Sequence, residues 1–516
     1  MSTVDSVPDS ARSAVPADPR RWVGLAVLCA SLLIVVMDMT ILNVAIPAID
    51  ADLHPSSVEL LWIVDVYSLV VAGFLVVAGG LADRFGRRRM LIIGYVAFGA
   101  IPLLVIVADS PVALIALRAL LGLGGALIMP STMSMIRNLF TDARERAVAL
   151  GIWGAMAAVG AGVGPIVGGA LLEVFTWHAA FLFNTPVMIV AIVASLLFLP
   201  ESYGAKVRWD ALGVVLSIVG MAGVVYAIKA FGKYGIADPT ALTATVIGVG
   251  CLVWFARRCL NRPEPLLDIR LLRSRELTAG LLCALVTSVA IAAMMLLIAQ
   301  WMQLVEGYTP LEAGLHLLPS AIVSGILSPL APRIADWIGA RTVMAGGLFV
   351  GGLGFALLYV IPRPWTYPPV AIALVLVGAG MASLAIGSAV IMSSAPAERA
   401  GNAAVMEETS FEVGNTLGVA VLGSIAAVMF ARLVAPIDLD ALGVSRADAE
   451  AARESIGGAI TVADDLGPAG AELADAARAA FTDALATVGL VGAALMIATA
   501  VIVWWMTPRG MSVEGH

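Results

Sequence analysis

Five of the ionisable side chains inside long apolar runs of this sequence are its main candidates for chemistry. They are the acids Asp38, Asp65, Glu408 and Glu412 and the base Arg118. A charge in the middle of a membrane costs about 2.5–3.5 kcal/mol on insertion scales, so such a side chain is kept facing a cavity or a partner. Each of the five is therefore a candidate for proton coupling and cation binding.

The positions of these residues suggest different roles. Asp38 lies near the middle of the first run, where burial disfavours the charged carboxylate and favours proton exchange. Glu408 and Glu412 are four residues apart, share a helix face and should titrate as a coupled pair. Arg118 is the natural counter-charge, able to release a carboxylate when a cation or proton arrives. There are alternatives for four of these residues. Asp38 and Arg118 could have purely structural roles, and Glu412 could lie at a water-exposed mouth. Asp65 lies nearer the outer boundary, and a structural role is as favoured there as a functional one.

Apolar runs that hold these residues make up most of the chain. Of 516 residues, 60% are hydrophobic and 13% are charged, with a mean hydropathy of +0.97. A soluble core stops growing at about 250–300 residues, so the solvent must be the bilayer. About fourteen runs are long enough to cross the membrane as helices, which predicts an all-α membrane protein. The approximate spans are 22–45, 60–81, 90–108, 112–135, 147–172, 179–199, 211–230, 241–255, 277–304, 313–332, 342–361, 370–392, 403–430 and 484–506.

Positive charge is distributed unevenly between the connections of these runs. With a cytoplasmic N-terminus, 22 of the 30 Lys and Arg residues fall in cytoplasmic loops and ends, which predicts both termini inside. The longest outer segment, 431–483, is acidic, and its spacing around Leu473 to Phe481 indicates a short amphipathic helix or a simple solvated loop. Residues 257–276 are expected to form an interfacial inner linker.

A first motif, GGLADRFGRRR at residues 79–89, follows the second run. Its glycines allow a tight turn and close helix approach, its aspartate can accept from a helix N-terminus, and its arginines stay among the headgroups. A decayed copy, ADWIGAR at 335–341, follows 253 residues later (336 minus 83) and implies two homologous halves with a substrate path between them. The residues with an expected conformational role are Gly79, Asp83, Gly86, Arg87 and Arg88, and Asp336 in the second copy.

A second motif, GAGVGPIVGG at residues 160–169, lies in the fifth run. Gly160, Gly164 and Gly168 fall on one helix face, where another helix can pack closely. Pro165 frees a backbone carbonyl and permits a bend. Generic helix packing is the alternative interpretation.

These motifs carry a resemblance to a known family. The first resembles the signature loop of the major facilitator superfamily, and the second resembles the fifth-helix motif of its drug:proton antiporters. The residues that lead into the sixth run also resemble that branch, namely Trp177, Phe181, Asn184 and Pro186. Residues 38–47, 62–69 and 408–412 resemble the fourteen-helix branch that exports quaternary ammonium compounds, dyes and methyl viologen. The resemblance extends from about Trp22 to the last run. Leu121 stands where the superfamily usually has glutamine, so the relay around Arg118 is expected to be simpler here.

The resemblance implies a division of the chain. Two pseudo-symmetric six-helix halves, 22–199 and 277–506, flank an inserted helix pair and linker at 200–276, with cytoplasmic tails at 1–21 and 507–516. It also implies a monomer in the bacterial cytoplasmic membrane that exchanges lipophilic cations for protons, using the proton motive force and no cofactor. Trp153, Met295 and Trp301 are weak candidates for an adaptable pocket wall, with core or lipid-facing packing the favoured alternative.

Other functional classes find little support. A phosphate-binding loop ending Gly-Lys-Ser/Thr, a nucleophile elbow and a His-Glu-x-x-His metal motif are all missing from the sequence, which argues against an enzyme. The four cysteines have no metal-ligand spacing and read as small buried hydrophobes. A net charge of -7 argues against nucleic acid. The serious competitor is a proton-coupled exporter of one specific antibiotic or metabolite.

Overall fold

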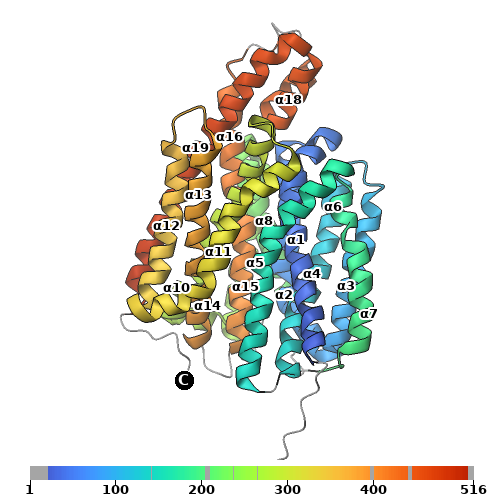
Figure 1. Cartoon of the computed structure of the whole chain (residues 1–516), viewed down its shortest axis with the longest axis vertical. Helices are drawn as coiled ribbons and strands as arrows, with labels where there is room; N and C mark the ends of the chain where they lie inside the picture. Colours follow the sequence, from blue (N-terminus) through green and yellow to red (C-terminus); the bar gives the residue numbers. More distant parts are fainter. Residues whose placement is uncertain are drawn as a thin grey trace, which may run out of the picture.

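The computed structural model describes residues 21–140, 142–203, 210–235, 237–263, 265, 267–394, 400–437, 439 and 444–508 (Figure 1). These residues form helices and their connections, with no strand among them. Fourteen helical segments in this part of the chain are long and apolar enough to cross a membrane, which confirms the predicted number. The predicted tails lie almost wholly outside the described residues, and so does the side chain of Asp83.

The N-terminal helices form one packed group with its own core. They are α1 (Arg21–Leu53), α2 (Ser57–Phe85), α3 (Arg87–Val105), α4 (Pro111–Leu139), α5 (Ala143–Val174), α6 (Ala179–Leu182) and α7 (Asn184–Phe198). Helix α1 packs on α4, α5 and α7, and α2 packs on α4. Side chains such as Leu28, Ile41, Tyr95 and Phe98 fill the space between them and are completely buried.

The C-terminal helices form a second group. They are α10 (Arg275–Gln300) with its π-helical end η2 (Trp301–Val305), α11 (Pro310–Ile338), α12 (Ala340–Val360), α13 (Tyr367–Gly380), α14 (Ala382–Ser394), α15 (Ala400–Leu417) with the π-helical turn η4 (Gly418–Gly423), α16 (Ser424–Val434) and α19 (Ala471–Met506). Their core forms a second cluster, and only Leu296 and Val419 of the described C-terminal side chains are buried in the first, which fits two halves. The boundaries of these halves stay a prediction.

Helices α2 and α11 show the internal repeat most clearly. Each has 29 residues and begins with a capping box, Ser56 with Glu59 and Thr309 with Glu312. Each also ends at a glycine with positive φ, Gly86 at 107° and Gly339 at 87°, followed at once by the next helix. Both features are 253 residues apart (309 minus 56, and 339 minus 86), the same offset as the sequence motif.

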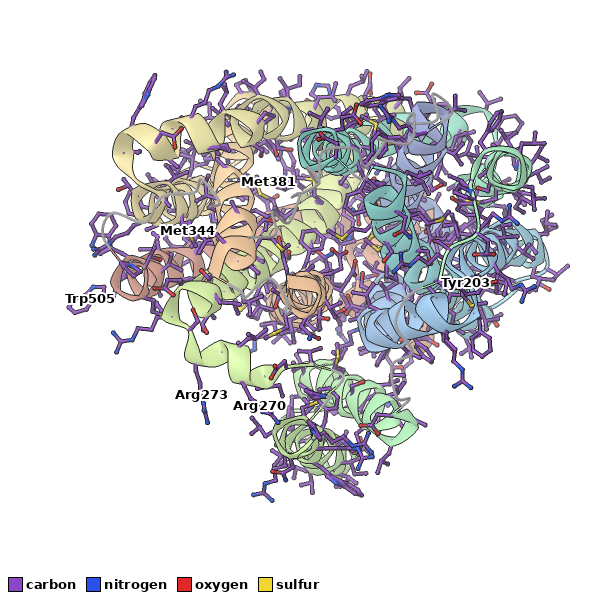
Figure 2. All side chains as sticks on the ribbon, turned by 90° about the horizontal axis from the view of Figure 1, so that it is seen from below. Tyr203, Arg270, Arg273, Met344, Met381 and Trp505 are labelled. Atoms are coloured by element: carbon purple, nitrogen blue, oxygen red, sulfur yellow. The ribbon has the colours of Figure 1, made fainter. Side chains whose placement is uncertain are left out.

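The inserted pair lies to one side of the two halves. Its helices, α8 (Ala211–Tyr234) and α9 (Pro239–Asn261), pack on each other, and α8 also packs on α2, η4 and α16. Asp210 caps α8 and accepts from Arg258 at 2.8 Å, which ties the two helices together at one end. Figure 2 shows the pair set apart from the bundle and joined to α10 through the segment that carries Arg270 and Arg273. That segment contains the short helix η1 (Ile269–Arg273).

Two short helices project beyond one end of the bundle (Figure 1). They are α17 (Arg446–Glu454) and α18 (Ile456–Asp465), and we call this end the outer end because the charge bias predicts that it faces outwards. The predicted amphipathic helix around Leu473 to Phe481 is wrong as a separate element, since these residues form the first turns of the 36-residue helix α19. Both side chains are buried, so the spacing reflected packing of a membrane helix.

Candidate functional site

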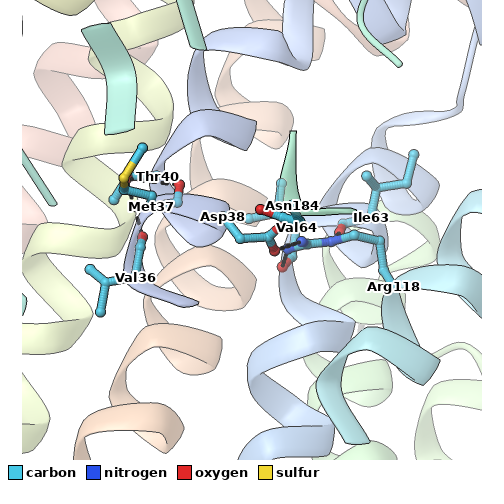
Figure 3. A network of polar contacts seen from close by, with 8 residues as sticks. All are labelled: Val36, Met37, Asp38, Thr40, Ile63, Val64, Arg118 and Asn184. Carbon is cyan, nitrogen blue, oxygen red and sulfur yellow. Dashed lines mark hydrogen bonds and ion pairs between the residues drawn. The ribbon is translucent and has the colours of Figure 1, made fainter. Parts of the chain in front are cut away.

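Asp38 and Arg118 form a buried ion pair inside the N-terminal group. Arg118 Nη1 lies 3.0 Å from Asp38 Oδ2, and both side chains are at most 2% exposed. The second carboxylate oxygen, Oδ1, accepts from the amide of Asn184 at 2.6 Å. Three helices, α1, α4 and α7, therefore meet at one carboxylate (Figure 3).

Arg118 is held by more than its ion pair. Its Nε donates to the carbonyl of Ile63 at 3.1 Å, and Nη2 lies 3.5 Å from the carbonyl of Val64. Its guanidinium lies 5.0 Å from the ring centre of Tyr67 and 6.0 Å from that of Phe181. These contacts hold the guanidinium in place in addition to its ion pair with Asp38.

Tyr67 connects this pair with the C-terminal group. The residue is fully buried and lies within electrostatic reach of Asp38, Arg118 and Glu412. Its hydroxyl has no hydrogen-bond partner among the described residues. It lies against α4, where a Cβ at position 125 would come within 2.3 Å of the Tyr67 oxygen, so Gly125 leaves the space for it.

Glu412 lies where α15 packs on α2. Its side chain is completely buried and forms no ion pair with any described residue. The polar side chains beside it are Ser68 of α2 and Asn415, and its nearest charged neighbour is Glu408. Glu408 is half-buried and likewise forms no ion pair in the described chain, while Glu407 lies beside Ser388. The interface between the groups thus contains a carboxyl group, that of Glu412, which no base in the described chain neutralises.

Asp65 does not join the other candidate acids. Lys229 Nζ of α8 lies 2.8 Å from Asp65 Oδ2, and both side chains are at most 1% exposed. The sequence analysis groups Asp65 with the proton-coupling acids and gives Lys229 no role. The signal was available, because a lysine inside an apolar run calls for a partner by the same reasoning as an aspartate.

The glycines of α5 have the close neighbours that their spacing indicated. A Cβ added at Gly160, Gly164 or Gly168 would meet α1, with the carbonyl of Leu33 at 2.9 Å in the first case and the Thr40 hydroxyl at 2.0 Å in the second. Other glycines of the motif face α11, which the sequence had not indicated. The carbonyl of Pro165 would lie 2.4 Å from a Cβ at position 314. Helix α5 is therefore a close-packed joint between the two groups.

The loop after α2 is fastened to the end of α7. The Arg88 backbone N–H donates to Glu201 Oε1 at 3.0 Å, and its guanidinium donates to the Leu199 carbonyl at 2.9 Å. The Arg87 N–H donates to the Ser202 carbonyl at 2.9 Å. Gly86 provides the predicted tight turn, and a Cβ there would also lie 2.7 Å from Glu201.

Three other residues of the signature motif and its copy were expected to have conformational roles, and the structure does not support them in the same way. Close helix approach at Gly79 is wrong, because the nearest atom to an added Cβ is a side-chain atom of Pro130 at 3.9 Å. Asp336 is exposed in the last turn of α11. The conformational role expected of Asp83 falls on a side chain outside the described part. Glu201 was missed, since nothing in its local sequence distinguishes it from an ordinary loop acid.

The aromatic and methionine candidates lie mainly in packing positions. Trp301 is completely buried in the C-terminal core, 5.6 Å from Trp365 between ring centres, and donates to Thr482 at 3.3 Å. This packing fits the favoured alternative of a core position, and the place of Trp301 in a pocket wall stays a prediction. Met295 packs on the same core and Trp153 on the N-terminal one, both half-buried, and their contact with substrate stays a prediction.

The two groups touch at the outer end. Gln303 Nε2 donates to the Val44 carbonyl at 3.1 Å, and Thr309 Oγ1 donates to Glu173 at 3.0 Å. The hydroxyl of Ser57 also donates to the Glu454 carbonyl in α17. Among the described residues, no group of three or more His, Cys, Asp or Glu side chains is placed to hold a metal ion.

Comparisons with known proteins agree with this architecture. Residues 28–419 match the family model described as Major Facilitator Superfamily. The chain is 38% identical to the multidrug efflux pump LfrA of Mycolicibacterium smegmatis, covering 98% of this chain and 99% of that one. It is 35% identical to the methyl viologen resistance protein SmvA of Salmonella typhimurium, covering 90% and 93%. A bacterial homologue of the lysosomal transporter Spinster, in an inward-facing and unoccupied conformation, has the same fold at 16% identity, with a TM-score of 0.66 over 96% of this chain and all of that one.

Proposed function

The chain belongs to the major facilitator superfamily and is a multi-pass membrane transporter, and on this premise we propose that it exports lipophilic cations in exchange for protons. The observation that carries the proposal is Glu412, a fully buried carboxyl at the interface of the two groups with no basic partner in the described chain. A carboxyl in this position is stable when it holds a proton or faces a bound cation. The similarity to proteins named for multidrug efflux and methyl viologen resistance supports this substrate class.

The carboxyl groups suggest how the exchange works. Asp38 has its own cation in Arg118, so protonation of Asp38 leaves the guanidinium without an ionic partner and changes the electrostatic environment of Tyr67. Glu408 and Glu412 have no such cation among the described residues, and they attract a positively charged substrate or a proton, but not both at once. Competition between proton and cation for one set of acids is the physical basis of antiport.

The helix joints suggest where movement occurs. Helix α5 packs on α1 and on α11 through glycines, and α2 packs on α15 beside Glu412. Closing contacts at the outer end, such as Gln303 to Val44, must break for the substrate to leave on that side. Rocking of the two groups about these joints would expose the acids to each side of a bacterial cytoplasmic membrane in turn.

Ethidium efflux from energised cells tests this proposal. Cells expressing Glu412→Gln or Glu408→Gln should lose uncoupler-sensitive efflux that the wild type shows. The matched control is Glu450→Gln in α17, where the side chain is 68% exposed and pairs only with an exposed arginine. Full efflux in both interface variants would reject the assignment of these acids. Wild-type cells that export no cation would instead favour an exporter of one specific antibiotic or metabolite.

A further inference from the structure

Lys229 reaches from the inserted pair into the N-terminal group. Its side chain is completely buried, its ammonium lies 2.8 Å from Asp65, and Nζ also lies 4.1 Å from the ring centre of Trp62. Both partners belong to α2, whereas Lys229 belongs to α8. Asp65 is the main charged neighbour of Lys229, and the reverse also holds.

The surroundings of the ammonium resemble those of a bound organic cation. A carboxylate supplies the ionic contact, and an indole face supplies the cation–π contact, which is strongest with tryptophan. Apolar side chains lie beside this site, since Trp62 packs against the cluster of Leu69, Val225 and Ala420, as do Met221 and Ile228. This combination of one acid, one aromatic face and an apolar lining is suited to an alkylammonium ion.

We propose that Asp65 and Trp62 form a site for a primary alkylammonium ion and that Lys229 occupies it as a tethered ligand. Because the tether never leaves the protein, Asp65 is neutralised and closed to cations from solution. Lys229 is in this view a specificity-determining residue that confines exported cations to Glu408 and Glu412. That last consequence rests on the proposed function, whereas the occupancy of the site does not.

The Lys229–Asp65 ion pair also affects how the inserted helices are attached to the bundle. Helix α8 touches α2 of the N-terminal group and also η4 and α16 of the C-terminal group. The buried ion pair is made only with α2, so it commits the inserted pair to the N-terminal group. During rocking, the contacts of α8 with η4 and α16 are the ones expected to slide.

Chemical rescue tests the site directly. Lys229→Ala removes three carbons and the ammonium, which together correspond to n-propylammonium. Purified Lys229→Ala protein should gain melting temperature on titration with n-propylammonium chloride against sodium chloride at equal ionic strength. The half-maximal concentration should be at least about tenfold lower than for the wild type or for the Lys229→Ala/Asp65→Asn double variant, which lacks the anion.

A size series provides the control for non-specific effects. Tetramethylammonium should not rescue Lys229→Ala, because its methyl groups keep the nitrogen farther from the carboxylate than the 2.8 Å seen for Lys229. Equal responses of the three proteins, or equal rescue by both amines, would overturn the proposal. If Lys229→Ala cannot be purified, n-propylammonium in the growth medium should restore its yield, and failure to do so would count against the site. None of these measurements involves transport, so the result is independent of the export proposal.

Discussion

Asp38→Asn is the substitution whose effect the structure defines best. In the wild type each carboxylate oxygen takes one donor, Arg118 at 3.0 Å on Oδ2 and Asn184 at 2.6 Å on Oδ1. An asparagine side chain has a single acceptor oxygen, so its NH₂ group must face one of the two donors in either orientation. The substitution therefore removes the counter-charge of Arg118 and also creates an unfavourable contact between two donors.

The energetic cost follows from burial of the pair. Removing one partner of a buried ion pair costs about 3–5 kcal/mol, because the other charge is left uncompensated. The carbonyls of Ile63 and Val64 still accept from Arg118, which favours the lower end of this range. Asp52→Asn on the same helix is the matched control, since Asp52 is exposed and Trp177 is its one donor among the described residues, from which an amide oxygen can also accept.

Thermal melting and ethidium efflux together test this reasoning. Asp38→Asn should melt well below the wild type and show no uncoupler-sensitive efflux, whereas Asp52→Asn should keep both properties. Asp38→Glu, which keeps the charge, should retain more stability than Asp38→Asn. A melting temperature and efflux rate for Asp38→Asn equal to those of the wild type would show that the ion pair contributes neither to stability nor to coupling.

Three further predictions follow from other parts of the molecule. Gly164→Ala should lower the melting temperature and slow efflux, because the added Cβ would lie 2.0 Å from the Thr40 hydroxyl and 3.1 Å from the Met37 carbonyl. Gly154→Ala in the same helix should change little, because no atom lies within 4 Å of a Cβ there. Equal effects of the two substitutions would refute the close α1–α5 joint. Each transport cycle should move at least two protons per monovalent cation. One-for-one exchange is electroneutral, so only the pH gradient would drive it, which gives about tenfold cation accumulation per pH unit. A one-to-one flux ratio measured in proteoliposomes would contradict this. The arginines bound to Asp210, chiefly Arg258, hold the pKa of its carboxyl below the ordinary value of 3.8. Asp210→Asn should therefore melt below the wild type at neutral pH, and this difference in melting temperature should disappear as the pH falls below 3.8. A difference that does not depend on pH would be inconsistent with the ion pair.

The helices and the repeat could be predicted because the membrane makes strong demands on the sequence. An apolar run long enough to span the bilayer has few other structures open to it, so the predicted number of spans agrees with the structure. Helix ends were less predictable. The eighth span, expected at 241–255, is the longer helix Pro239–Asn261, because Asp238 caps its start and Arg258 finds an ion-pair partner near its end.

The candidate site was partly predictable, for a related physical reason. Burial cost alone singles out Asp38 and Arg118, but their pairing depends on the packing of α1, α4 and α7, which residue spacing does not encode. The pairing of Asp65 with Lys229 depends on where the inserted helices dock. The fate of Leu473 to Phe481 was unpredictable in another way, since a helical spacing fits both a short surface helix and the start of a longer buried one.

Proton movement during cation transport is the most direct test of the central claim. Purified protein in liposomes should take up ethidium added outside while the internal pH rises, because protons leave in exchange. Asp38→Asn should abolish both signals, whereas a protonophore should abolish the pH change and any accumulation of ethidium above equilibrium. Ethidium uptake by the wild type without any change in internal pH would contradict proton-coupled export.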